Sequence, residues 1–449
     1  MSSRNTVFVW IAFACALGLS AQAQAQLARD PGVRTGTPGA GQPLPNLPSG
    51  ERSYFDAGLA DFAEEEGVGD GLGPRFNLDG CAGCHMQPAI GGSSPPVNPQ
   101  VAVATAFGAR NSVPSFITQN GPVREARFKR QSNGSPDGGV HALFVVSGRV
   151  DSTGNASTCN IQQEDFAGQV ARNNVVFRIP TPVFGTGLIE SISENTLRNN
   201  LASQGDTKSR FGISGRFNRS GNDGTISRFG WKAQNISMLV FSGEAYNVEM
   251  GITNEAFMQE REENGNCQYS GTPNDITQVG GASGTDSISS IEKFAIFMRF
   301  LDQPRPSANS PGGSDSIGRG RQLFTSTGCG LCHSPQLRTG NASVAALQNQ
   351  QVNLFSDLAI HNMGPRLADG VAQGAAAGDE FRTAPLWGLG QRIFFLHDGR
   401  TNDLVDAIQA HASSGNSQFG ASEANRTIGN YNNLSERSKQ DLLNFLRSL

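Results

Sequence analysis

Residues 81–85 read CAGCH and residues 329–333 read CGLCH. In this pattern two thiols add to the vinyl groups of a haem, and the imidazole beside the second thiol coordinates the haem iron. One match is moderately specific, whereas two matches in one chain make coincidence a poor explanation. The sequence therefore predicts two covalently attached haems c. Their attachment residues are Cys81, Cys84, Cys329 and Cys332, and their first iron ligands are His85 and His333.

Two other uses of paired cysteines fit less well. A zinc site with four thiolates uses CxxC pairs that are usually about 15–20 residues apart, but the two pairs here are separated by more than half of the chain. Zinc would also give no role to the histidine that follows each pair. A thioredoxin-like pair would need a βαβ context, which the sequence around neither pair suggests. We therefore favour haem over zinc or a redox dithiol.

The first 25 residues have the features of a secretory signal peptide. Arg4 supplies a positive charge, residues 7–19 form a short apolar run, and small residues of the Ala-x-Ala type follow at 21–25. The apolar run is shorter than the roughly 20 residues that a membrane-spanning helix needs. We therefore predict that residues 1–25 are a signal peptide, that the protein is exported to the periplasm, and that it has no transmembrane anchor.

The charge of the remaining chain is weakly acidic. Without Arg4, 34 basic residues oppose 39 acidic ones, which gives a formal charge of −5. No run of basic residues suggests binding to nucleic acid or to an anionic membrane. A weakly acidic surface would suit a basic redox partner protein, although most such surfaces are only solvated.

Two cysteines remain once Cys15 of the signal peptide and the four haem-binding cysteines are set aside. Cys159 and Cys267 form either a disulfide or two buried thiols, and the sequence alone does not bring them together. An oxidising compartment favours the disulfide.

The composition, with 55 glycines and 22 prolines in 449 residues, suggests two or three compact units joined by much irregular chain. Residues 26–50 are rich in proline and glycine and predict a flexible linker. Residues 51–310 are expected to form an N-terminal cytochrome c-like haem domain with a β-containing insertion, and residues 311–449 a C-terminal one. The predicted fold class is mostly α, with two cytochrome c-like haem domains and a β-containing, loop-rich connecting region.

Apolar residues at helical spacing predict several helices. Phe55, Leu59 and Phe62 share one stripe before the first CxxCH motif. Helical signals return at 254–262 and 290–301, and the chain ends in an amphipathic helix. Elsewhere between about residues 100 and 310, short apolar runs broken by Gly, Asn and Ser predict short strands and long loops.

The second axial ligand of each iron decides whether a small molecule can bind there. His411 is the best candidate, because Leu404, Ile408 and His411 share one face of a helix that Thr401 is expected to cap. A satisfied core histidine is the alternative for this residue. The remaining candidates, each more often structural than ligating, are His141, His361 and Met363.

Residues 381–390 (FRTAPLWGLG) and 395–400 (FLHDGR) resemble the C-terminal domain of bacterial di-haem cytochrome c peroxidases. They are also similar to relatives that mature a tryptophan-derived quinone cofactor. The chain resembles most the di-haem oxidoreductase family described as predicted thiol oxidoreductases. Further stretches that resemble this family are 180–190, 230–233 and 357–370.

The resemblance implies roles for the two haems. In the peroxidases a ligand to the C-terminal haem, commonly Met, lies on the helix after the His-Asp-Gly turn, and His411 corresponds to it. Two histidine ligands generally give a lower reduction potential than His and Met, so this chain departs from a high-potential electron store. The N-terminal haem is where the relatives bind peroxide, often behind a distal histidine shortly after the motif. Here the next histidine is His141, which implies an open iron or an unusual ligand.

Cleavage of a peroxide bond needs an acid that accepts and returns a proton. Glu190, which follows the apolar residues Leu188 and Ile189, is the candidate for this catalytic residue. A carboxylate at a helix start or on the surface is the alternative. Trp231 is either an electron relay between the haems or a core side chain.

These observations leave two functions open. The first is an exported di-haem oxidoreductase of the peroxidase type, which reacts with a small oxidant such as hydrogen peroxide and takes electrons from a redox partner protein or a small-molecule donor. Its N-terminal haem would react, and its C-terminal haem, with two histidine ligands, would transfer electrons. The second is a di-haem electron-transfer protein without catalytic chemistry of its own.

Overall fold

The computed structural model describes residues 27–146, 150–151, 154–155, 159–259, 261, 267, 273–306 and 310–449. The predicted signal peptide, residues 1–25, therefore lies outside the described residues. None of the helices in the described part is long and apolar enough to cross a membrane.

Helices make up most of the regular structure, and the strands are short. The helices are α1 (Ser49–Ala63), α2 (Cys81–Cys84), α3 (Gln100–Val103), α4 (Phe166–Ala171), α5 (Thr186–Glu190), α6 (Glu194–Ala202), α7 (Gly205–Phe211), α8 (Met238–Met250), α9 (Ser290–Phe300), α10 (Gly313–Thr327), α11 (Gly364–Leu367), α12 (Leu404–Ala410), α13 (Asn425–Asn432) and α14 (Glu436–Ser448). The strands are β1 (Arg75–Phe76), β2 (Glu125–Phe128), β3 (Val140–His141), β4 (Phe144–Val145), β5 (Val150–Asp151), β6 (Gly154–Asn155), β7 (Val175–Arg178), β8 (Leu337–Arg338), β9 (Gln351–Val352), β10 (Ile360–Asn362) and β11 (Glu380–Arg382).

Helices α1 and α9 frame the N-terminal unit. The apolar stripe of α1 packs on α9, with the ring of Phe297 5.3 Å from that of Phe55 and 5.0 Å from that of Phe62. Gly58 lies between these rings, and a Cβ there would overlap the carbonyl oxygen of Lys293. The glycine therefore lets the two helix backbones approach closely, and the helices predicted from these stripes are present.

Helices α10 and α14 frame the C-terminal unit in the same way. Phe324 of α10 packs on Phe445 of α14 with ring centroids 5.5 Å apart. A Cβ at Gly320 would overlap the carbonyl oxygen of Asp441, so glycine again allows the close crossing. The predicted C-terminal helix is therefore present and fully packed.

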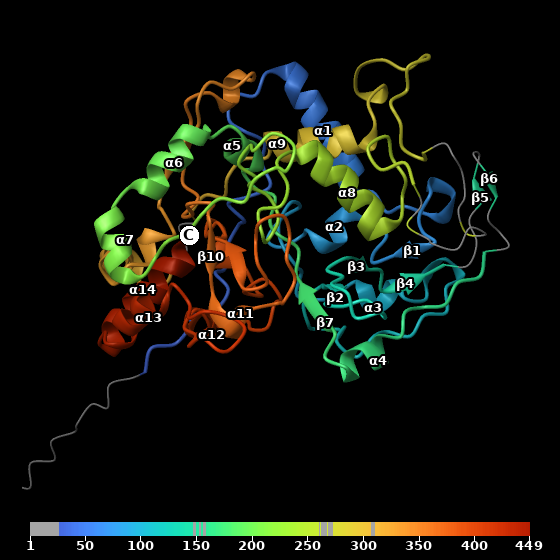
Figure 1. Ribbon diagram of the computed structural model, residues 1–449. Helices are drawn as coiled ribbons and strands as arrows, with labels where there is room; N and C mark the ends of the chain where they lie inside the picture. Colours follow the sequence, from blue (N-terminus) through green and yellow to red (C-terminus); the bar gives the residue numbers. More distant parts are fainter. Residues whose placement is uncertain are drawn as a thin grey trace, which may run out of the picture.

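The two units repeat one arrangement around the two CxxCH motifs. In each, a phenylalanine of the first helix lies beside the histidine of the motif. The ring of Phe62 is 6.0 Å from that of His85, and the ring of Phe324 is 6.4 Å from that of His333. Figure 1 shows α1, α2, α8 and α9 together on one side of the molecule and α12, α13 and α14 on the other.

A small antiparallel sheet lies in the connecting region, in the strand order β3-β2-β7. Its register pairs Glu125 of β2 with Arg178 of β7. The short strands predicted for this region are present, but it also contains α6, α7 and α8, which the sequence did not indicate. The sheet is important for the site because it carries Glu125 and Arg178 to one place.

The helix predicted at 254–262 is wrong over its described part, residues 254–259. Gly251, at φ +77°, ends α8 before this stretch. The side-chain oxygen of Asn254 then accepts hydrogen bonds from the backbone N–H groups of Ala256 and Phe257. Because that oxygen captures the N–H groups, these residues form a turn instead of a helix.

Residues 27–50, for which we expected a flexible linker, pack against both units. The carboxylate of Asp30 forms an ion pair with Arg447 of α14 at 2.6 Å, and these side chains are only 7% and 1% exposed. Farther along, the backbone N–H of Leu44 donates to the carbonyl of Phe300 at the end of α9. Proline and glycine here mark an irregular but packed segment, because its polar groups find partners on the helices.

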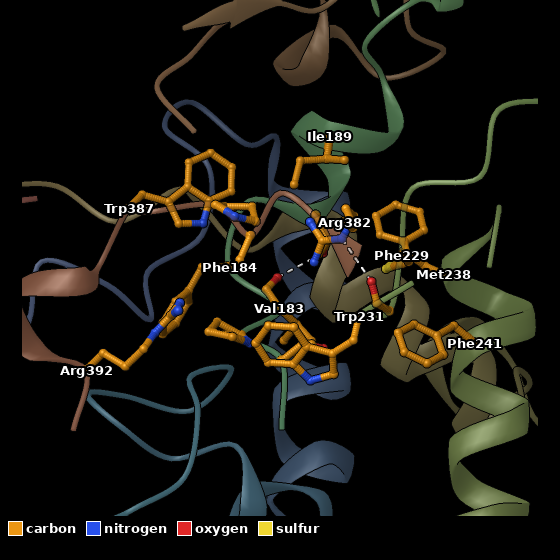
Figure 2. A pocket seen from close by; sticks show the side chains of 16 residues that line it. Val183, Phe184, Ile189, Phe229, Trp231, Met238, Phe241, Arg382, Trp387 and Arg392 are labelled. Carbon is orange, nitrogen blue, oxygen red and sulfur yellow. Dashed lines mark hydrogen bonds between the residues drawn. The ribbon is translucent and has the colours of Figure 1, made fainter. Parts of the chain in front are cut away.

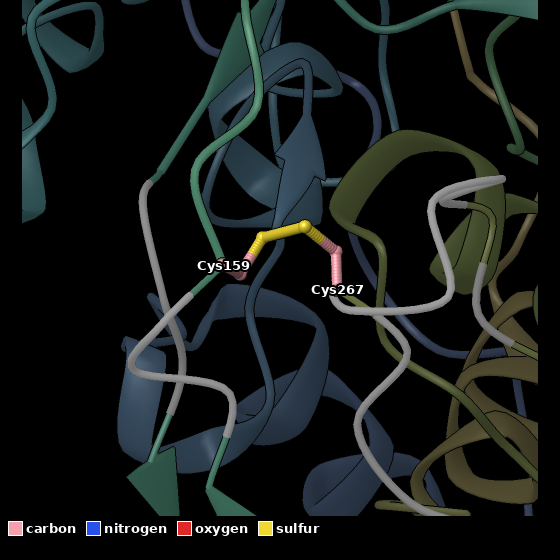
Figure 3. Close-up of a disulfide and its surroundings, with 2 residues drawn as sticks. All are labelled: Cys159 and Cys267. Carbon is pink, nitrogen blue, oxygen red and sulfur yellow. A yellow bond between two sulfur atoms is a disulfide. The ribbon is translucent and has the colours of Figure 1, made fainter.

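Cys159 and Cys267 form a disulfide, which confirms the favoured pairing. Figure 3 shows the bond joining two segments that lie 108 residues apart in the sequence. Both cysteines are buried and contact Val145 and Ile161. The disulfide therefore ties the segment after β6 to the segment after α8.

Candidate functional site

Each CxxCH motif folds into one tight turn that presents its side chains to a cavity. In the first motif the backbone N–H of His85 donates to the carbonyl of Cys81 at 3.1 Å, and in the second the N–H of His333 donates to that of Cys329 at 3.0 Å. A turn of this kind brings the two cysteines and the histidine of a motif to one side. The motifs thus have equivalent local structures.

The two cavities are similar in size and lining. The N-terminal cavity, which Cys81, Cys84 and His85 line, has a volume of about 180 Å³. The C-terminal cavity, which Cys329, Cys332 and His333 line, has a volume of about 210 Å³. Both are mainly lined by apolar side chains. A haem, which is large and flat with a mostly apolar surface, fits such a site.

Three histidines have their rings fixed in the same way. In His85, His333 and His411, Nδ1 lies within hydrogen-bond distance of a backbone carbonyl. The carbonyls are those of Gly92 at 3.0 Å, Phe355 at 3.0 Å and Ala407 at 2.8 Å. Because Nδ1 must donate its proton to a carbonyl, Nε2 carries the free lone pair that a metal needs.

Burial keeps these three rings neutral. It lowers the pKa of His85 and of His333 to about 4, and it lowers the pKa of His411 as well. A neutral imidazole is the form that binds iron. His411 follows the last turn of α12 and lines the same cavity as His333. Its place is therefore the one expected for a second ligand to a C-terminal haem.

The other ligand candidates in the C-terminal cavity are less suitable. Both nitrogens of His361 face carboxylates, with Nε2 3.1 Å from Asp357 Oδ2 and Nδ1 2.8 Å from Glu423 Oε2. His397 stacks on Phe381 at 4.2 Å. Met363 also lines this cavity.

One trio of residues offers donors for a different metal. Ligand atoms of Cys332, Asp357 and His361 all lie within 4.8 Å of one another. They supply three donors where structural zinc takes four, and Cys332 faces the cavity beside Cys329. The arrangement is equally compatible with haem attachment at Cys332, because Asp357 and His361 then remain a buried ion pair.

His141 lies outside both cavities. Its Nε2 is 3.1 Å from Asp137 Oδ2, and its ring stacks on Phe128 at 3.6 Å. No second histidine lines the N-terminal cavity among the described residues. The sequence-based interpretation, an open position or an unusual ligand on this side, therefore remains a proposal that the surroundings of His85 support.

Glu190, the predicted catalytic acid, lies at the end of a helix outside the lining of the N-terminal cavity. It ends α5, and its Oε2 is 2.9 Å from the guanidinium of Arg299. It does not line the N-terminal cavity. An apolar context in the sequence does not ensure that a carboxylate faces a cavity, because the last residue of a short helix can turn outward. The catalytic role of Glu190 stays a prediction, and carboxyl groups that do line the cavity are further candidates.

Glu125 and Glu249 line the N-terminal cavity and hydrogen-bond to each other. Arg127 Nε donates to Glu125 Oε1 at 2.6 Å, and Asn77 Nδ2 donates to Glu249 Oε2 at 2.6 Å. The two glutamates lie 124 positions apart, on β2 and α8. Only the fold brings them together, so the sequence could not have indicated the pair.

The pair is split into one ionised and one protonated carboxyl. Burial alone would raise the pKa of Glu125, but the positive charges of Arg127 and Arg178 outweigh burial and hold this pKa below its usual value. Burial and the neighbouring charge of Glu125 raise the pKa of Glu249 to about 8. At neutral pH the cavity therefore holds a carboxylate that can accept a proton beside a carboxylic acid that can give one.

The N-terminal cavity is also lined by residues with buried polar atoms that lack a hydrogen-bond partner. Several buried side-chain atoms in the described part of the chain have no hydrogen-bond partner, and among them are Nε of Arg178, Oε1 of Gln234 and Oγ of Ser242. All three residues line this cavity. Buried polar groups are normally satisfied, so a bound group with a polar edge fits here, and the propionates of a haem provide one.

Trp231 lines both cavities. Its Nε1 donates to the carbonyl of Ile179 at 2.9 Å, and it is 9% exposed. It also lines a third, smaller cavity, and Figure 2 shows Trp231 and Trp387 among the side chains around it. Trp231 is therefore a buried side chain that also lies between the two candidate haem sites.

Comparisons with known proteins agree with the motifs. Residues 125–449 match the family described as "Di-haem oxidoreductase, putative peroxidase". No curated protein sequence matches the chain. Among solved structures, hydrazine synthase of Kuenenia stuttgartiensis is 15% identical, with a TM-score of 0.28 over 57% of this chain and 88% of that one. A MauG-like protein associated with microbial copper homeostasis is 17% identical, with a TM-score of 0.27 over 57% and 89%.

Proposed function

This chain belongs to the di-haem oxidoreductase family, and from that premise we propose that it carries two covalently attached haems c and reduces a small oxidant such as hydrogen peroxide. The proposal assigns one haem to Cys81, Cys84 and His85, and the other to the second motif. The N-terminal haem is the reactive one. The second haem is held by Cys329, Cys332, His333 and His411.

One observation carries the assignment of roles. The C-terminal cavity holds a second neutral imidazole, His411, with Nε2 free to bind. Among the described residues, the N-terminal cavity has instead the carboxyl pair Glu125 and Glu249. A metal with two protein ligands suits electron transfer, whereas an open position beside an acid suits reaction with a small molecule.

The bound haem iron supplies the electron chemistry of the reaction. The protein supplies the proton transfers. Glu125 Oε1 and Oε2, kept ionised by Arg127, can accept a proton from a peroxide that enters the N-terminal cavity. Glu249, kept protonated, can donate a proton to the departing oxygen. The two groups together move one proton from one peroxide oxygen to the other, and the pair returns to its starting charge.

Other features of the chain are consistent with separate roles for the two haems. The repeated helix pairs, α1 with α9 and α10 with α14, support two cytochrome c-like units. Trp231, which borders both cavities, provides an aromatic side chain between them through which electrons can pass. Electrons would come from a redox partner protein or a small-molecule donor. The signal peptide proposed at residues 1–25 would take the protein to the periplasm, where haem c is attached.

The second candidate function is an electron-transfer protein that does not react with oxidants. One observation favours it: the thioethers of Met250 and Met298 also line the N-terminal cavity. A thioether sulfur is a common axial ligand in electron-transfer haems. If either methionine bound the N-terminal iron, both haems would be closed.

Carbon monoxide binding separates the two functions. The intact mass of the purified protein first establishes that two haems are attached. The reduced protein is then titrated with carbon monoxide while the Soret band is recorded. We expect one carbon monoxide for every two haems, and a change of the ferric spectrum when hydrogen peroxide is added. No binding of carbon monoxide together with no response to peroxide would reject the enzyme and leave the electron carrier.

A further inference from the structure

Two arginines, one buried and one half-buried, line the same side of the C-terminal cavity. Arg382 lies on β11, and its backbone N–H donates to the carbonyl of Trp231 at 2.9 Å. Arg382 and Arg392 both line the C-terminal cavity and also the third cavity, which Trp231 borders. Figure 2 shows both guanidinium groups among the side chains around that third cavity. The two cations therefore lie on the side of the C-terminal cavity that faces Trp231.

These arginines have no carboxylate partner in the described part of the chain. Arg382 is 8% exposed, and its Nε donates to the carbonyl of Gly230 at 2.9 Å. No hydrogen bond or ion pair of the Arg392 side chain occurs among the described residues. The pKa of each is lowered to about 10, in Arg392 by burial and in Arg382 by burial together with the charge of Arg392. A buried and a half-buried positive charge therefore lie near each other without a counter-charge among the described residues.

Two other buried arginines of this protein have carboxylate partners. Arg447 forms an ion pair with Asp30 at 2.6 Å, and Arg178 forms one with Asp369 at 2.8 Å. Leaving a buried charge without a partner is strongly destabilising. A pair of unpartnered cations at one place therefore indicates a ligand with two negative charges.

We infer that Arg382 and Arg392 form a cradle for two carboxylates, and that its ligand is the pair of propionates of the haem attached at Cys329 and Cys332. This inference rests on the proposed function, since it needs the C-terminal haem. Guanidinium groups bind carboxylates through parallel N–H···O hydrogen bonds. The propionates would then be held by residues that line the cavity together with Trp231.

The cradle changes what the C-terminal haem can do. Two histidine ligands alone give a low reduction potential. Buried cations near the haem favour its reduced form, which carries one positive charge less, and so raise the potential. The arginine pair thus offsets part of the effect of His411 and lets a haem with two histidine ligands hold an electron for the reaction at the other haem.

The test compares Arg392→Gln with Arg338→Gln in the holoprotein. Arg338 lies on β8, is exposed, and loses the same charge on the surface. Haem attachment is checked by intact mass, and the midpoint potential of the C-terminal haem is measured by spectroelectrochemistry at several pH values. Above the pKa of the propionates, Arg392→Gln should lower the equilibrium constant for reduction at least about tenfold, which is about 59 mV for a one-electron couple. Arg338→Gln should leave it unchanged.

The pH dependence provides a second readout. In Arg392→Gln the propionate pKa should rise into the measurable range, so that the potential falls as the pH rises through it. In the wild-type protein the potential should be flat over about pH 5–7, because two cations keep both carboxylates ionised. Arg392→Lys, which keeps the charge, should stay close to the wild-type potential.

The outcomes are separable. If the mass shows no haem at residues 329–333, the proposed function fails. If both haems are attached and Arg392→Gln matches Arg338→Gln in potential and pH dependence, the cradle is refuted while the proposed function stands. If Arg392→Gln does not fold, a wild-type potential that falls with one proton per electron over about pH 5–7 would refute it instead.

Discussion

Replacing Glu249 with Gln removes the proposed proton donor without emptying its place. Glutamine has the size of a protonated glutamate and can keep the hydrogen bonds to Asn77 and Glu125, so haem content and folding should not change. General acid–base catalysis typically contributes about 10²–10⁴-fold to a rate. We therefore expect the bimolecular reaction of the ferric protein with hydrogen peroxide to slow by about that factor in Glu249→Gln.

The pH dependence of the wild-type reaction rate gives a second estimate of how much the proton of Glu249 contributes to the rate. The acid form of Glu249 is the active one, so activity is expected below its pKa and is lost above it. With a pKa of about 8, the protonated fraction is about 0.9 at pH 7 and about 0.1 at pH 9, a tenfold fall in rate. Groups that face Glu249 and share in this titration are Glu125 and Arg127 of β2, and Arg261 beyond α8.

Stopped-flow absorption of the Soret band measures both effects. The matched control is Glu244→Gln, on the same helix, where Glu244 accepts a hydrogen bond from Asn235 and does not line the cavity. This control should keep the wild-type rate and the fall between about pH 7 and 9. If Glu249→Gln reacted at the wild-type rate with the same pH profile, Glu249 would not be the proton donor.

The remaining predictions concern ligation and stability. His411→Ala should turn the C-terminal haem from low-spin to high-spin and let it bind carbon monoxide, as read from the visible spectrum. Replacing Cys159 and Cys267 with Ser should lower the free energy of unfolding by about 4.8 kcal/mol, because the disulfide closes a loop of 108 residues; denaturant titration measures this. Asp30→Asn should cost about 3–5 kcal/mol in the same assay, since it leaves Arg447 buried without a partner.

Each of these has a control and a contrary result. An unchanged spectrum in His411→Ala would exclude His411 as a ligand. Reduction of the wild-type disulfide should reproduce the serine variant, and no loss of stability in either would contradict the loop argument. The control Asp56→Asn breaks an exposed ion pair with Arg52 and should lower the free energy of unfolding by at most about 0.5 kcal/mol. If Asp30→Asn had an equally small effect, the buried ion pair would contribute no more to stability than the exposed one.

Local patterns predicted the parts of the protein that are local. The CxxCH motifs, the stripe of Phe55 and Phe62, and the terminal helix each lie within a short stretch whose spacing determines its structure. The same spacing placed His411 on one face of the helix, and it does line the C-terminal cavity, while its role as an iron ligand stays a prediction. The disulfide followed from counting cysteines and from the compartment.

The parts that were missed depend on contacts between distant residues. Glu125 and Glu249 become an acid pair only because β2 and α8 meet, whereas Glu190 was chosen from its neighbours in the sequence and turns toward Arg299. The segment 27–50 has the composition of a linker, and its packed structure depends on contacts with helices that are distant in the sequence. Arg382 and Arg392 became candidates only from the structure, which shows no carboxylate partner for either among the described residues.

The central claim is that one iron has an open position beside Glu125 and Glu249 while the other is closed by His411. Electron paramagnetic resonance of the fully oxidised protein at low temperature tests this directly, because it separates high-spin from low-spin ferric haem and quantifies each. We predict one high-spin and one low-spin haem in equal amounts, with the high-spin signal lost on addition of a strong-field ligand such as cyanide. Two low-spin haems, or a protein without haem signals, would contradict the account.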